Sequence, residues 1–129
     1  MKFSLTRKLL VIALIGVFSQ ISLAQNPNGD ALKQIADIVA SINHFPSDAD
    51  KATLMAISGN ASLADGVRAM ASAVHNISHA ANAEGKTAMA GIQANAEAPD
   101  RAKALAGIIA SVNHMASADD KATLAELFP

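Results

Sequence analysis

A unit of 35 residues occurs three times in this sequence, and this period constrains the fold more than any other feature. Repetition at such a period is typical of repeat proteins, in which each unit buries its hydrophobic face against its neighbours. The units span residues 30–64, 65–99 and 100–129. Equivalent positions carry the same or similar residues, among them Asp30, Asp65 and Asp100; Lys33, Arg68 and Lys103; His44, His79 and His114; and Lys51, Lys86 and Lys121.

Each unit begins with a stretch in which apolar residues recur at intervals of three and four. This period is that of one face of an α-helix, and it differs from the strict alternation of a half-buried strand. The aspartate that opens each unit is predicted to be the N-cap of this helix. The predicted core positions are Leu32, Ile35, Ile38, Val39 and Ile42, then Val67, Met70, Ala73, Val74 and Ile77, then Ala102, Leu105, Ile108, Ile109 and Val112.

A second helix is predicted in each unit, after a break that follows the histidine. Ser47, Asn82 and Ser117 are residue types preferred at N-caps. The helix then buries one pair of apolar residues per unit, and Gly59-Asn60 is expected to end its first copy with a left-handed C-cap. Gly85 and Gly91 are expected to weaken the second copy. The apolar pairs are Leu54 and Ile57, Met89 and Ile92, and Leu124 and Leu127.

These patterns predict an all-α fold of three tandem αα-hairpin repeats with six helices. The array is expected to be either a short open solenoid or a compact bundle. Residues 25–129 are expected to form one domain, because a segment of this length is typical of a single domain. The period is similar to that of tetratricopeptide units. The Trp, Gly, Tyr and Pro signature positions of that family have no counterparts here, so its peptide-binding function is not inferred.

Residues 1–24 are predicted to be a cleavable secretory signal peptide. Lys2, Arg7 and Lys8 precede the apolar run from Leu9 to Phe18, and Ser22-Leu23-Ala24 supplies small residues for cleavage before Gln25. The run is too short to span a bilayer, and no later stretch is apolar enough to do so. The protein is therefore expected to be exported, to the periplasm or beyond the cell.

Charge and composition exclude several classes of function. Without Lys2, Arg7 and Lys8, seven of the ten basic residues remain against eleven acidic ones, a formal charge of −4. An acidic chain is poorly suited to nucleic acid. The absence of cysteine excludes disulfides, thiolate zinc sites and thiol catalysis. No sequence motif of a nucleophile, phosphate loop or metalloprotease is present, so the chain is not expected to be an enzyme.

The row of His44, His79 and His114 is the sharpest candidate feature. The preferred interpretation is structural, with each imidazole donating to the last carbonyls of the preceding helix. Binding of one metal ion by all three is not expected, because stacked helical repeats lie about 8–10 Å apart and ligands of one ion must converge within a few ångström.

His75 and His79 form a separate candidate site for a divalent metal ion. Residues four apart share one face of a helix, and Glu84 is the nearest carboxylate that could join them. A haem-handling role of these histidines is a related alternative. No other cofactor is predicted.

The remaining repeated residues have plain structural explanations. The basic side chains of the row that begins with Lys33 are expected to form ion pairs with the aspartates three residues away. This row consists of Lys33, Arg68 and Lys103. The methionines fall at helical spacing and are expected to fill the core: Met55, Met70, Met89 and Met115. The sequence therefore predicts an exported helical-repeat binding module, with a protein partner or self-association, and a small metal- or haem-handling protein using His75 and His79 as the alternative.

Overall fold

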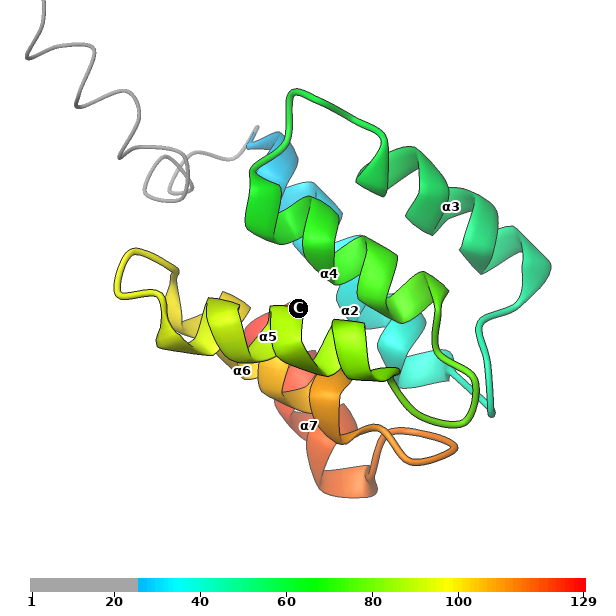
Figure 1. Ribbon diagram of the computed structural model, residues 1–129. Helices are drawn as coiled ribbons and strands as arrows, with labels where there is room; N and C mark the ends of the chain where they lie inside the picture. Colours follow the sequence, from blue (N-terminus) through cyan, green and yellow to red (C-terminus); the bar gives the residue numbers. More distant parts are fainter. Residues whose placement is uncertain (1–25) are drawn as a thin grey trace, which may run out of the picture.

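The structure, a computed structural model, describes residues 26–129, and in this range the chain is all-helical. The predicted signal peptide and its cleavage site lie outside the described residues. Six helices occur in the described range, as predicted, together with four isolated β-bridges and no β-strand. The helices are α2 (Pro27–Ser41), α3 (Asp48–Ser58), α4 (Asp65–His75), α5 (Ala83–Ala94), α6 (Asp100–Ser111) and α7 (Ala118–Leu127) (Figure 1).

The hydrophobic core consists of the residues that the helical period selects. All fifteen positions predicted for the first helices of the three units are buried. In the second helices, Leu54, Ile57, Met89, Ile92 and Leu124 are buried, whereas Leu127 is half-buried. Burial of one face of each amphipathic helix is the main source of stability in such a fold, since single short helices are marginal in water.

The helix starts follow the prediction for the second helices only. The side chains of Ser47, Asn82 and Ser117 accept hydrogen bonds from backbone N–H groups in the first turns of α3, α5 and α7. The prediction for the aspartates was wrong, because Asp65 and Asp100 are the first helical residues of α4 and α6 rather than their caps. There they face the positive end of the helix dipole, which a carboxylate stabilises.

Helix α2 begins earlier than its copies in the other two units. Its N-cap is Asn26, whose side chain accepts from the backbone N–H groups of Asn28 and Gly29. Pro27 occupies the first helical position, where the missing N–H has no helical partner in any case. Asp30 is consequently a residue of the first turn and not a cap.

Gly59 is the C-cap of α3, as predicted, but its predicted left-handed conformation is wrong, since its backbone is right-handed with φ −89°. In the described range the only positive φ angles belong to His44, His79 and His114, at 74°, 71° and 69°. The helices before them end three or four residues earlier than predicted, at Ser41, His75 and Ser111. The unusual backbone therefore lies in the connections and not at the helix ends.

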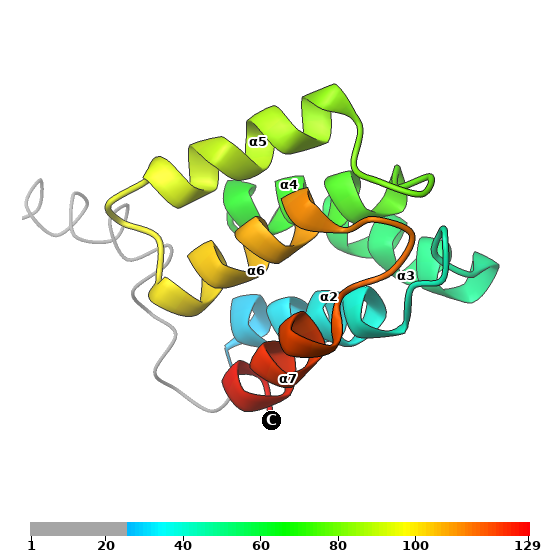
Figure 2. The same cartoon turned by 90° about the horizontal axis from the view of Figure 1, so that it is seen from below.

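The three repeats close into a ring. The first helices of the three units (α2, α4 and α6) contact one another, and each second helix packs against the first helix of the next unit. Thus α3 contacts α4, α5 contacts α6, and α7 returns to contact α2 (Figure 2). Of the two arrangements left open by the sequence, the described residues adopt the closed bundle.

Helix α5 also packs against α4, the first helix of its own unit, and Gly85 explains the close approach. A Cβ atom added at Gly85 would lie 3.4 Å from Cβ of Ala73 and 3.2 Å from Oδ1 of Asn82. Gly91, in the same helix, has no such neighbour within 4 Å. None of the helices in residues 26–129 has the length and apolar character needed to cross a bilayer.

Candidate functional site

One end of the bundle is built from the three connections that join the two helices of each unit. We call this surface the loop face and define it by residues 43–47, 78–82 and 113–117. In Figure 1 these connections lie together although they are far apart in sequence, and Figure 2 shows the same convergence from another side. Each loop doubles back on itself, with an isolated bridge between the residues on either side of its histidine.

A closed cycle of backbone hydrogen bonds joins the three loops at their histidines. The N–H of His79 donates to the carbonyl of His44, that of His114 donates to His79, and that of His44 donates to His114. Each histidine backbone is therefore both donor and acceptor. The positive φ angles belong to these three residues, so the turn conformation and the cycle occur together.

The three imidazoles meet above this cycle. Their ring centroids lie 5.0 to 5.2 Å apart, and each pair is edge to face with interplanar angles of 78° to 87°. One ring nitrogen from each of His44, His79 and His114 lies within 4.8 Å of the other two, and all three side chains are exposed. The expectation that these histidines stay too far apart to share one ion was wrong, because the repeats close around an axis instead of stacking in a row.

The imidazoles of His44 and His114 contact the preceding asparagine and not the helix-end carbonyls that were predicted as their partners. Nδ1 of His44 lies 2.6 Å from Oδ1 of Asn43, and Nδ1 of His114 lies 2.8 Å from Oδ1 of Asn113. An amide oxygen can only accept a hydrogen bond, so a hydrogen bond at these positions requires the proton on Nδ1 of His44 and His114. In that tautomer of the neutral imidazole, Nε2 has the free lone pair.

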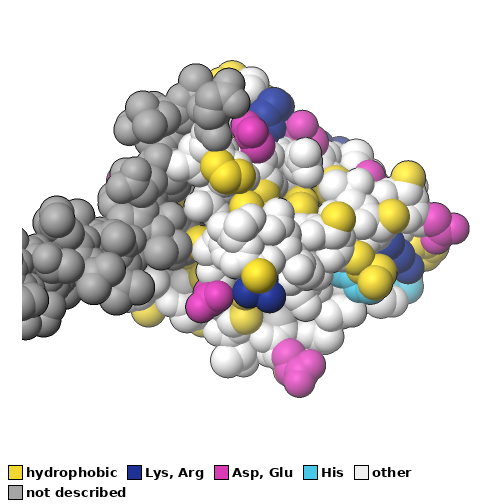
Figure 3. All heavy atoms as spheres, turned by 90° about the horizontal axis from the view of Figure 1, so that it is seen from above, with side chains coloured by type: hydrophobic (Ala, Val, Ile, Leu, Met, Phe, Trp, Pro, Cys, Tyr) yellow, Lys and Arg dark blue, Asp and Glu magenta, His cyan; other side chains and the backbone are white. Residues whose placement is uncertain are grey.

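Two large apolar side chains accompany the histidines. Phe45 and Met115 directly follow His44 and His114, are equivalent by the repeat, and are 55% and 45% exposed. Ala80 is the third member of this set. Lys51 adds a positive charge, with Nζ 5.7 Å from the centroid of the Phe45 ring. In Figure 3 histidine side chains, coloured cyan, are visible at one edge of the surface, beside hydrophobic and basic side chains.

The methionine prediction therefore holds for only two of the four residues. Met70 and Met89 are fully buried and fill the core. Met115 stands on the loop face, and Met55 is 61% exposed on α3. Helical spacing did not distinguish these cases, since it places a residue on a helix face without showing whether a neighbour covers that face.

His75 and His79 do not share a helix face. Helix α4 ends at His75, whereas His79 lies beyond it in a loop with positive φ. The half-buried His75 has Nδ1 3.3 Å from Oδ1 of Asn76. His79 instead groups with the histidines of the other two units. His75 and His79 therefore lack the shared helix face on which the predicted metal site was based. Their role in metal binding stays a prediction.

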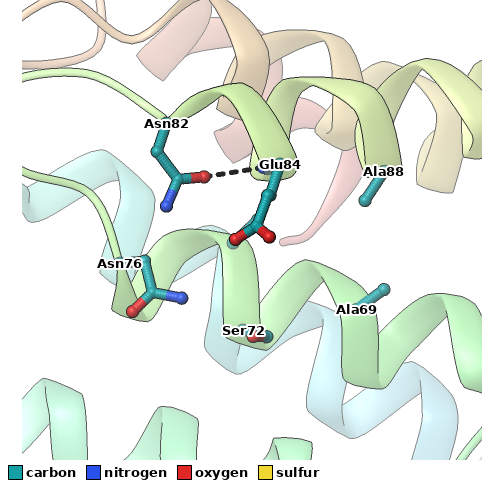
Figure 4. Close-up of a pocket in the computed structure, with 8 residues that line it drawn as sticks. Ala69, Ser72, Asn76, Asn82, Glu84 and Ala88 are labelled. Atoms are coloured by element: carbon teal, nitrogen blue, oxygen red, sulfur yellow. Dashed lines mark hydrogen bonds between the residues drawn. The ribbon is translucent and has the colours of Figure 1, made fainter.

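Glu84, the carboxylate predicted to join that pair, lies in a different place. It lines a shallow cavity of about 210 Å³ between α4 and α5, together with Ser72, Asn76 and Asn82. Figure 4 shows the Glu84 side chain extending toward α4, with the Asn82 side chain engaged in capping α5. The Glu84 carboxylate is not among the ligand atoms grouped with the histidine nitrogens.

The predicted pairing of the basic row with the aspartates is found in one repeat. Arg68 lies 3.7 Å from Asp65, three residues away. Lys33 pairs instead with Asp37 at 3.3 Å, one turn later on α2. Both pairs are at least partly exposed, so their contribution to stability is small.

No family model matches this chain, and neither a curated protein nor a solved structure matches it. The function of this chain is therefore inferred from the geometry of the loop face.

Proposed function

We propose that this chain is an exported binding protein, not an enzyme, and that the loop face is its binding surface. The observation that carries the proposal is the convergence of equivalent loops from all three repeats at one end of the bundle. Three short loops that are separated by 35 residues each thereby contribute to one composite surface. Repeat proteins commonly bind through such surfaces of equivalent positions.

The chemistry of the histidine position supports a binding role. Positive φ is tolerated best by glycine and next by asparagine, aspartate and histidine. The backbone cycle uses only N–H and carbonyl groups, which any of these residues supplies. An imidazole that is exposed in all three copies adds nothing to the core. The recurrence of histidine at this position is best explained by a ligand or partner that contacts the imidazoles.

The partner that this surface fits best is a protein with apolar side chains, including a second copy of this chain. Phe45 and Met115 supply the exposed apolar area, and aromatic residues and methionine are enriched in protein interfaces. Because residues 1–24 are predicted to be a secretory signal, we propose that this interaction occurs in the periplasm or outside the cell. A second candidate function, metal handling, is favoured by the nitrogen atoms of the three histidines and is developed below.

The proposal is tested with protein purified after export, in a buffer that contains EDTA. Self-association is measured by sedimentation velocity, and partners are captured by cross-linking in extracts of the native compartment. The test variant carries Phe45→Ser and Met115→Ser, and the matched control carries Met55→Ser, which removes a still more exposed apolar side chain outside the loop face.

The loop-face variant is expected to weaken association by about tenfold or more, as for loss of an interface anchor. The control is expected to associate as the wild type does. Equal association of all three proteins would remove the loop face as the protein-binding surface.

A further inference from the structure

We propose that His44, His79 and His114 together form a binding site for one divalent transition-metal ion of the zinc, copper and nickel class. The inference rests on the proposed function only in placing the ligand on the loop face. It differs from the site expected at His75 and His79, because the ligands come from three repeats and not from one helix.

The number and spacing of the nitrogen atoms suit such an ion. One nitrogen from each ring lies within 4.8 Å of the other two. Three nitrogens bound to one ion at about 2.0–2.1 Å would lie roughly 3.3–3.6 Å from one another. Each imidazole then needs to move by about 1 Å or less, which small side-chain rotations supply because terminal torsions of histidine are broad.

The contacts of two imidazoles leave Nε2 as the atom that can bind an ion. Nδ1 of His44 lies 2.6 Å from Oδ1 of Asn43 and Nδ1 of His114 lies 2.8 Å from Oδ1 of Asn113, and in the tautomer that donates to these oxygens the free lone pair is on Nε2. A metal-binding histidine usually donates its other ring N–H to an oxygen in this way, which fixes both tautomer and ring orientation. In the second repeat this position is Ser78, whose hydroxyl is shorter. The site is therefore oriented in two repeats by an amide and is less constrained in the third.

The backbone also prepares the site. The cycle of hydrogen bonds holds the three histidine backbones together without any ion. Binding then orders three side chains and does not have to assemble three loops. Backbone conformations with positive φ in residues other than glycine cluster at binding sites, where the surroundings hold them in place.

The ligand set indicates the class of ion. Three imidazoles suit zinc, copper, nickel and cobalt, whereas magnesium and calcium require oxygen ligands. The site is exposed and supplies three nitrogens, so the remaining coordination positions face solvent. A site of this kind binds an ion that water, or a side chain of a partner, can reach.

The test uses exported protein that has been stripped with EDTA and transferred to a metal-free buffer. Calorimetric titration with Zn²⁺, Cu²⁺ and Ni²⁺ is expected to give one ion per chain, with Mg²⁺ giving no binding. Thermal unfolding should shift upward with ion concentration, as linkage requires for an ion that binds only the folded state. Lowering the pH should weaken binding, because only the unprotonated imidazole is a ligand.

Three single variants assign the ligands: His44→Asn, His79→Asn and His114→Asn. Asparagine tolerates positive φ, so these variants keep the backbone and lose the imidazole. Each is expected to lower the affinity by about 100-fold or more, whereas loss of a supporting hydrogen bond typically costs about 10–100-fold. The matched control is His75→Asn, which removes the one histidine outside the cluster and should bind as the wild type does.

Three outcomes overturn the inference. The first is the absence of both heat and thermal shift with all three ions. The second is full affinity in a triple His→Asn variant. The third is loss of affinity in His75→Asn, which would return the site to the pair of His75 and His79. Failure here is separable from failure of the proposed function, because association through Phe45 and Met115 is measured in EDTA.

Discussion

The ammonium group of Lys33 in the first repeat donates to the backbone carbonyl of Phe128, at the end of the third, across 3.4 Å. Arg68 makes the equivalent contact one unit later, with Nε donating to the carbonyl of Ser58 at 3.1 Å. Residues 58 and 128 are two repeat lengths apart. The contact that joins neighbouring repeats therefore recurs where the last repeat meets the first, which is direct evidence that the ring is closed.

Phe128 is predicted to be essential to this closure. Its side chain is buried, and the guanidinium carbon of Arg101 lies 5.2 Å from its ring centroid. Phe128→Ala should lower the free energy of unfolding by about 3 kcal/mol, the usual cost of a large buried truncation. Urea unfolding measures this, with Met55→Ala as a control that should stay within about 0.5 kcal/mol of wild type. An unchanged midpoint in Phe128→Ala would contradict closure by α7.

Substitutions at His44 are predicted to separate its backbone role from its side-chain role. Alanine at this positive φ should cost about 1 kcal/mol and valine about 2 kcal/mol or more, because a Cβ atom, and above all a branched one, is strained there. Glycine should stay near the wild-type stability, since relief of strain offsets the added freedom of the unfolded chain.

Denaturant unfolding gives the stability differences, and the same series at His79 and His114 is the control. The three positions have nearly the same φ, so their effects should be similar in size. A large loss of stability with glycine at any of them would mean that the imidazole itself holds the fold together.

Two glycines of α5 are predicted to respond in opposite ways to alanine. Gly91→Ala should raise the free energy of unfolding by about 0.5–1 kcal/mol, because the added methyl group meets nothing and the helix propensity improves. Gly85→Ala should lower it, because the methyl group crowds Ala73 and the capping oxygen of Asn82. Thermal unfolding of the two variants side by side measures the difference. Equal gains would show that α5 does not need its close approach to α4.

Processing of the N-terminus provides a separate prediction. The small residues at Ser22-Leu23-Ala24 predict that the exported protein begins at Gln25. Mass spectrometry of protein recovered after export determines the first residue. Recovery of a chain that still carries Met1 to Ala24 would contradict the predicted signal peptide.

The sequence predicted the helices and their buried faces because both depend on local periodicity. Leu32, Ile35 and Val39 lie on one face of α2 whatever the rest of the chain does, and their burial follows from the amphipathic pattern. The N-caps at Ser47 and Ser117 were predictable for the same reason, since a cap and its N–H partner are three residues apart.

Convergence of the histidines was not predictable in this way. It depends on the packing of α7 against α2, where Lys33 and Phe128 meet although they are 95 positions apart in the sequence. The positive φ of His44 also leaves no trace in the hydrophobic period. One property of the sequence did contain the information: in a closed ring of three repeats, a residue that recurs at 44, 79 and 114 can meet its copies at the axis, whereas in an open array it cannot.

The cycle of backbone hydrogen bonds between the three histidines has a consequence for how mutations can change the loop face during evolution. In a homotrimer of single units, every position around the axis would be occupied by three identical residues, and any mutation would appear three times. Covalent fusion of the units removes that restriction. The centre keeps three histidines, while the next position carries Phe45, Ala80 and Met115, so one side of the axis differs from another. A symmetric scaffold thereby presents an asymmetric surface, which can hold a partner in a single orientation.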